Sequence, residues 1–117
     1  MGNNIAFQPM GKTYQANATT TSQTILVQSD ISCNQLMVAS HENTAGTGKP
    51  VYFRVSTDSN VTITAPSAGN PQYAMAIPPG QVRVFTVPTQ FTTSGLYIAF
   101  ITEGSTAECY FTPGEGL

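Results

Sequence analysis

The chain has 117 residues, of which only ten are charged: four Lys or Arg and six Asp or Glu, for a formal net charge of −2 at pH 7. Its polarity is mostly uncharged, with 17 threonines, nine serines, eight glutamines and seven asparagines. Four scattered cations cannot provide the basic surface of a nucleic-acid-binding protein, and no stretch comes near the roughly 20 apolar residues of a membrane-spanning helix, so we expect neither nucleic acid nor membrane as a partner.

Apolar and polar residues alternate along most of the chain, as in β-strands with one buried face. Turn residues such as those of Pro78-Pro79-Gly80 separate these segments. About 8–10 short strands at this spacing are typical of sandwiches and barrels. We therefore predict an all-β fold, a single antiparallel β-sandwich or jelly-roll-like barrel with little or no helix, forming one domain over residues 1–117. In chain order, the expected strands are 12–18, 24–27, 36–39, 51–56, 61–64, 73–77, 82–87, 96–101 and 109–111.

Two of the expected strands, 82–87 and 96–101, are apolar on both faces. One explanation is that a loop of the same chain covers the second face. The other is that the second face is a contact surface for another protein, since exposed apolar patches usually mark interaction sites. The sequence leaves both explanations open.

The two ends of the chain differ from its middle. Pro113 lacks the amide hydrogen that an interior strand needs, so the strand is expected to stop there and the tail 112–117 to leave the sheet. The opening residues carry no basic and apolar regions of a signal peptide. We interpret 1–11 and 112–117 as possible docking extensions.

Cys33 and Cys109 lie far apart in the sequence and form neither a CxxC spacing nor a cluster with histidine. A structural zinc site is therefore not expected, and no other metal or cofactor is indicated. We interpret the pair as small buried thiols, although a disulfide between them stays possible.

Catalysis would require titratable side chains that converge. The single histidine, His41, follows Ser40, and adjacent side chains of a strand point to opposite faces, which disfavours a nucleophile and base pair. Glu103 and Glu108 would be close together if they flanked a hairpin turn at Gly104, where like charges destabilise a hairpin. We predict no enzyme, and a small hydrolase built around His41 is the weaker alternative.

The C-terminal sequence Tyr110–Leu117 resembles the ends of small structural proteins from tailed bacteriophages. The resemblance spans essentially the whole chain and consists of turn and strand patterns. The further matching segments are Phe7–Lys12 with its Phe-Xaa-Pro-Xaa-Gly-Lys pattern, Ala16–Thr21, Val51–Phe53 and Pro79–Thr86.

This resemblance implies a non-enzymatic virion protein, foremost a capsid decoration or cement protein that stabilises the head. Such a protein is assembled in the host cytoplasm, binds the major capsid protein or other virion proteins, and forms a homo-oligomer, with a trimer favoured. Alternation and the resemblance together identify the expected interface residues, which are Phe7, Tyr52, Phe85, Tyr97, Tyr110, Pro113 and Leu117.

Other functions stay open at this stage. The chain could belong to the tail, neck or a fibre of the virion. It could also be a receptor- or carbohydrate-binding module, which would present a solvent-facing aromatic cluster drawn from Tyr52, Tyr73, Tyr97 and Tyr110. An immunoglobulin-like secreted domain is weaker, because the chain has no tryptophan to pack against a cysteine pair.

Overall fold

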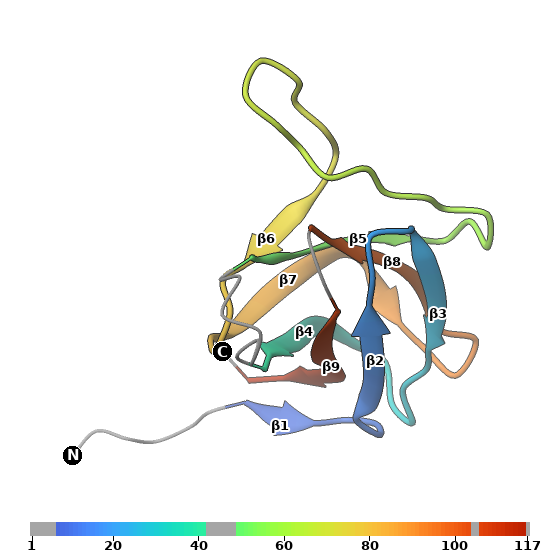
Figure 1. Cartoon of the computed structure of the whole chain (residues 1–117). Coiled ribbons are helices and arrows are strands. Elements are labelled where there is room, and N and C mark those ends of the chain that lie inside the picture. Colours follow the sequence, from blue (N-terminus) through green and yellow to red (C-terminus); the bar gives the residue numbers. More distant parts are fainter. Residues whose placement is uncertain (1–6, 42–48, 104–105, 117) are drawn as a thin grey trace.

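The computed structural model describes residues 7–41, 49–103 and 106–116, and these ranges contain nine β-strands and no helix (Figure 1). All strand pairs are antiparallel and form two sheets. The predicted all-β antiparallel sandwich is therefore confirmed. The strands are β1 (Gln8–Pro9), β2 (Tyr14–Ala18), β3 (Gln23–Val27), β4 (Cys33–Ser40), β5 (Val51–Ser56), β6 (Met75–Ile77), β7 (Val82–Phe91), β8 (Leu96–Thr102) and β9 (Ala107–Glu115).

The strand pairings have the order of a jelly roll. β2 pairs with β9, β3 with β8, β4 with β7 and β5 with β6, so the chain forms one long antiparallel ribbon. The pairs β9–β4 and β8–β5 then join alternate parts of this ribbon into sheets. The resulting sheet A has the order β1-β9-β4-β7, with β2 also on β9, and sheet B has the order β3-β8-β5-β6. Eight strands in two such sheets define the jelly-roll architecture.

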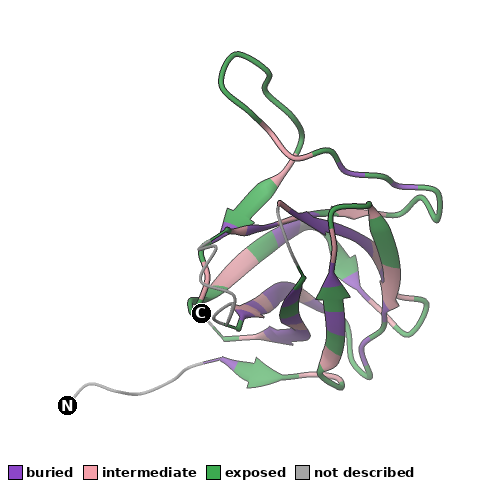
Figure 2. Cartoon of the chain, viewed as in Figure 1, coloured by how far each residue is buried: buried purple, intermediate pink, exposed green. Residues whose placement is uncertain are grey.

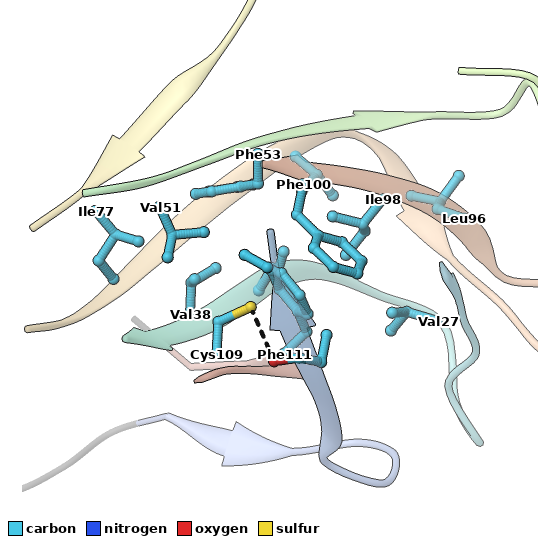
Figure 3. Close-up of a cluster of buried hydrophobic side chains, with 14 of the residues drawn as sticks. Val27, Val38, Val51, Phe53, Ile77, Leu96, Ile98, Phe100, Cys109 and Phe111 are labelled. Atoms are coloured by element: carbon cyan, nitrogen blue, oxygen red, sulfur yellow. Dashed lines mark hydrogen bonds between the residues drawn. The ribbon is translucent and has the colours of Figure 1, made fainter. Parts of the chain in front are cut away.

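The hydrophobic core lies between the two sheets. Side chains from both sheets point toward one another there (Figure 3), and burial alternates with exposure along most strands (Figure 2). The Phe111 ring of sheet A lies 6.1 Å from the Phe53 ring and 5.9 Å from the Phe100 ring of sheet B, measured between centroids. Each fully buried side chain of this size stabilises the fold by about 1.5–3 kcal/mol.

Both cysteines are free and buried in this core. The Sγ atom of Cys109 donates a hydrogen bond to the backbone oxygen of Ala16, 3.5 Å away (Figure 3). The interpretation of Cys33 and Cys109 as small buried thiols is therefore confirmed, and there is no disulfide between them.

The connection from β5 to β6, residues 57–74, which we call the covering loop, runs over the outer face of sheet B in its first part and then projects away from the domain (Figure 1). Val61 and Ile63 of this loop are buried against Ala99 and Ile101 on the outer side of β8. The second apolar face of β8 is therefore explained by a loop of the same chain.

The prediction of a strand over residues 61–64 is wrong. Val61 and Ile63 alternate with exposed neighbours as strand residues do, but they pair with no strand: the Val61 amide donates to the Asp58 backbone oxygen in a turn, and two further backbone groups bond to side-chain hydroxyls. The Thr24 hydroxyl donates to the backbone oxygen of Val61 at 3.0 Å, and the Ile63 amide donates to the Ser22 hydroxyl at 3.0 Å. These hydroxyl groups take the place of a partner strand.

The prediction that the strand stops at Pro113 is also wrong, because β9 runs to Glu115 with Pro113 fully buried. The nitrogen and carbonyl of one strand residue point to the same side, and the Pro113 carbonyl accepts a 2.9 Å bond from the Met10 amide. Met10 lies at the junction between β1 and β2. No strand residue at this junction has a carbonyl that would need an amide hydrogen from position 113, so a proline is tolerated there.

The described parts of both chain ends therefore have partners inside the domain. β1 pairs with the last residues of β9, where Gln8 lies opposite Glu115. The buried Phe7 ring lies over Gly114, at a point that a Cβ atom would occupy. Residues 1–6 and Leu117 lie outside the described residues, and the docking role of the ends stays a prediction.

Candidate interaction surfaces

Part of the outer face of sheet A is apolar, and no loop among the described residues covers this part. The pairing register places two rows of side chains across β7, β4 and β9, on the side opposite the core. Val82 is 57% exposed, and the other apolar members are half-buried. We call this surface the open face, and it consists of Val82, Val84, Met37, Ala39 and Tyr110.

The open face carries little charge. Among the described residues of β4, β7 and β9, Glu108 is the only charged side chain that alternation places on this side, and its Oε2 accepts a 3.3 Å hydrogen bond from the Tyr110 hydroxyl. Ala39 lies opposite both Val82 and Tyr110 in the register, so these three side chains form one row of the face. Near the end of β9, the Phe7 ring covers this side of sheet A over Gly114.

The two strands that are apolar on both faces thus have different surroundings. On β8, the covering loop buries the second face. On β7, the second face holds Val82 and Val84 and is left uncovered by the described residues. The first explanation therefore holds for β8, whereas the second, a contact surface for another protein on β7, stays a prediction.

An apolar groove of about 320 Å³ lies between β7 of sheet A and the β5–β6 edge of sheet B. At its floor, the Phe53 and Phe85 rings meet edge to face, with centroids 5.1 Å apart. Tyr73 is 83% exposed and Met75 is 49% exposed. The residues that line the groove are Phe53, Arg54, Val55, Tyr73, Ala74, Met75, Phe85, Thr86 and Val87.

The lip of the groove carries a cation on an aromatic ring. The Arg54 guanidinium carbon lies 5.4 Å from the centroid of the Tyr73 ring, within the range of a cation–π contact. Arg54 also donates a 3.4 Å bond to the backbone oxygen of Thr62 in the covering loop. The Arg54 side chain is thus held at the junction between the loop and the groove.

The two glutamates that could have formed a carboxylate pair are separated. β8 and β9 belong to different sheets, so Glu103 and Glu108 do not face each other across a hairpin, and Gly104 lies outside the described residues. Each carboxylate accepts a 3.3 Å bond from a tyrosine hydroxyl, Glu103 from Tyr52 and Glu108 from Tyr110. Desolvation and then the neighbouring carboxylate raise the pKa of both tyrosines.

Ser40 and His41 lie on opposite sides of the backbone, with Ser40 buried and His41 exposed. The described residues therefore contain no pairing of these two side chains as nucleophile and base. They also contain no group of three or more His, Cys, Asp or Glu side chains that could hold a metal ion. In the same ranges, no helix is long and apolar enough to cross a membrane.

Two of the predicted interface residues are not available at the surface. Phe7 is buried over Gly114, and Pro113 is buried within β9. Both were expected in free extensions, but β1 and the end of β9 pair with each other instead. Leu117 lies outside the described residues.

The remaining four predicted residues are half-buried and lie on three different surfaces. Tyr52 and Tyr97 pack beside the covering loop on sheet B. Phe85 lines the groove, and Tyr110 belongs to the open face. Alternation could have identified Val82 from its position next to Arg83, but it could not show which outer face the loop leaves bare.

The fold and these surfaces define an all-β jelly-roll domain with one uncovered apolar sheet face and one apolar groove among its described residues. In comparisons with known proteins, no family model, no curated protein and no solved structure matches the chain.

Proposed function

We propose that this chain is a non-enzymatic structural protein of a bacteriophage virion, a capsid decoration or cement protein that binds its neighbours through the open face. One observation carries the proposal: a loop of the chain covers the outer side of β8 in sheet B, whereas the described residues leave the open face of sheet A uncovered, with Val82 57% exposed. The outer face of an antiparallel sheet in water is usually polar, and an apolar one usually marks a contact with another protein.

The scarcity of charge supports the same proposal. Charged residues are depleted at the centres of protein interfaces, and the open face has Glu108 alone among the described charged side chains of its strands. The partner is the major capsid protein or another virion protein, in a homo-oligomeric arrangement. Because many copies bind one particle, each contact can be modest and still hold the protein in place.

The jelly-roll fold is compatible with this role but does not distinguish it from other functions. Jelly rolls occur in viral capsid domains and also in lectins, and function depends on sites rather than on the fold. A carbohydrate-binding module is therefore the second candidate, favoured by the exposed Tyr73 ring with Arg54 against it. Of the tyrosines expected in a solvent-facing cluster, however, Tyr110 lies on sheet A, and Tyr52 and Tyr97 on sheet B are half-buried beside the covering loop.

The test compares two substitutions that add the same charge at different faces. Val84→Glu places a carboxylate on the open face, and Thr62→Glu places one at an exposed position of the covering loop. Phage particles are produced with each variant, and copies per particle are measured by quantitative mass spectrometry. We expect a fixed ratio of wild-type chain to major capsid protein, the same ratio for Thr62→Glu, and a loss of about tenfold or more for Val84→Glu, because an unpaired charge is costly to bury in an interface.

Circular dichroism and thermal unfolding of the purified variants show whether each is folded. Absence of the wild-type chain from purified particles would overturn the proposal, and so would normal incorporation of folded Val84→Glu. Glycan-array binding that is lost in Tyr73→Ala would instead support the second candidate.

A further inference from the structure

The groove between β7 and the β5–β6 edge arises because β6 is short. β6 pairs with Val51–Phe53 only, and the chain bends away at Tyr73. Among the described residues, no strand lies beside the remaining part of β5, from Arg54 to Ser56, on this side. The groove occupies the place that a longer β6 would fill, and its floor is the contact between the two phenylalanine rings.

β7 presents an unpaired edge at the same place. The Ser40 amide donates to the Gln81 oxygen at 2.9 Å, which fixes the phase of the antiparallel β4–β7 ladder. In that phase, Arg83 and Phe85 direct their backbone groups toward β4, whereas the residues between and beside them direct theirs away from the sheet. Val82, Val84 and Thr86 therefore have backbone groups in the position that an added strand would use.

We infer that this groove and the β7 edge bind an extended segment of a different protein, in which a large apolar side chain enters the groove and a carboxylate lies near Arg83. This second contact adjoins the open face, because it uses the backbone edge of β7 and not the outward side chains of that strand, and it does not depend on the virion role. The groove volume of about 320 Å³ is at the lower end for ligand pockets and fits one or two large side chains.

The charge of Arg83 favours a different protein over a second copy of this chain as the partner at the β7 edge. Arg83 shares the groove-facing side of β7 with Phe85, and inward-pointing charges on edge strands are a known obstacle to edge-to-edge pairing. Pairing of two β7 edges would bring two copies of Arg83 together, and Pro88, which has no amide hydrogen, would limit the paired length. An acidic segment would turn the repulsion into attraction.

The two positive charges at this site have no carboxylate partner among the described residues, although the Arg54 side chain is held by Tyr73 and by the Thr62 oxygen. Neither Arg54 nor Arg83 forms an ion pair among the described residues. No acidic residue is among those that line the groove. An apolar floor with cations at its margin therefore complements a segment in which apolar and acidic residues alternate.

The test uses the purified full-length protein and a library of random 12-residue peptides displayed on yeast. We expect selection to enrich peptides that place Asp or Glu within two positions of Phe, Leu or Val. The synthesised peptides are then measured by fluorescence anisotropy with wild-type protein, Arg83→Glu and Lys12→Glu. Lys12→Glu makes the same charge change outside the groove and is the matched control.

We expect Arg83→Glu to increase the dissociation constant about tenfold or more, because a close charge partner is lost and its charge reversed. Lys12→Glu should change the dissociation constant less than about twofold. A Phe85→Ala variant, checked for folding, is expected to weaken binding as well. The inference is overturned if no acidic peptides are enriched or if the peptides bind Arg83→Glu as tightly as wild type.

Discussion

The Phe53 and Phe85 rings meet edge to face across the two sheets, with centroids 5.1 Å apart and ring planes at 69°. Phe53 belongs to β5 and is 1% exposed, whereas Phe85 belongs to β7 and is half-buried. The contact therefore joins sheet A to sheet B at the margin of the core. Because the same pair forms the groove floor, this position contributes both to stability and to the proposed docking site.

Phe85→Ala is expected to lower the free energy of unfolding by about 2 kcal/mol, roughly half the cost of truncating a fully buried phenylalanine. Urea unfolding measures the change through the midpoint at constant m-value. The matched control is Val82→Ala, on the outward side of the same strand, which should change stability by less than about 0.5 kcal/mol. Equal effects of the two substitutions would show that Phe85 does not pack against the core.

Ile63→Ala is expected to lower the free energy of unfolding by about 2 kcal/mol, at the lower end for buried isoleucine because the site lies at the margin of the fold. It should also increase the hydrogen-exchange rates of backbone amides in the covering loop and in β8. Thr62→Ala, at the exposed neighbouring position, should have little effect. A loop that exchanges freely in the wild-type protein would contradict the account of this face.

Gly114→Ala is expected to displace the N-terminal segment. A Cβ atom at this position would come within 2.3 Å of the Phe7 ring and 2.4 Å of the Gln8 oxygen, and overpacking of this kind typically costs about 1–3 kcal/mol. Hydrogen exchange of the Met10 amide, which donates to the Pro113 oxygen, should accelerate in the variant. Unchanged exchange and stability would show that Phe7 and β1 do not pack on β9 in solution.

Burial raises the pKa of the Cys109 thiol from its ordinary value of 9.0 to about 12. Above pH 9 the unfolded chain loses this proton while the folded chain keeps it, so the stability conferred by the neutral thiol is present below pH 9 and is lost as the pH rises toward 12. The slope is at most about 1.4 kcal/mol per pH unit. Urea unfolding between pH 8 and pH 10.5 should show a shallower decline for Cys109→Ala than for wild type, and identical slopes would contradict the prediction.

Most of the fold could be predicted from the sequence because period-two alternation follows directly from burial of one strand face. The expected segments at 51–56 and 96–101 coincide closely with β5 and β8. Residues 61–64 misled the same reasoning, since Val61 and Ile63 are buried in alternation without any partner strand. Alternation reports which side chains are buried, and it does not report how the backbone is bonded.

The ends and the surfaces depended on contacts between distant parts of the chain. Pro113 fits inside β9 because Met10 meets its carbonyl at the junction of two short strands, which no local rule anticipates. The sequence likewise identified two doubly apolar strands but could not assign the covering loop to β8 rather than to β7. That assignment follows from the sheet order, and it decides where the open face lies.

A reconstruction of the phage particle that locates this chain would test its proposed role in the virion. The proposed function predicts ordered, symmetry-related copies on the particle, with Val82, Val84 and the rest of the open face buried against a neighbouring protein and the covering loop away from that contact. Ordered copies whose open face points to solvent, or particles that contain no copy of the chain, would contradict it.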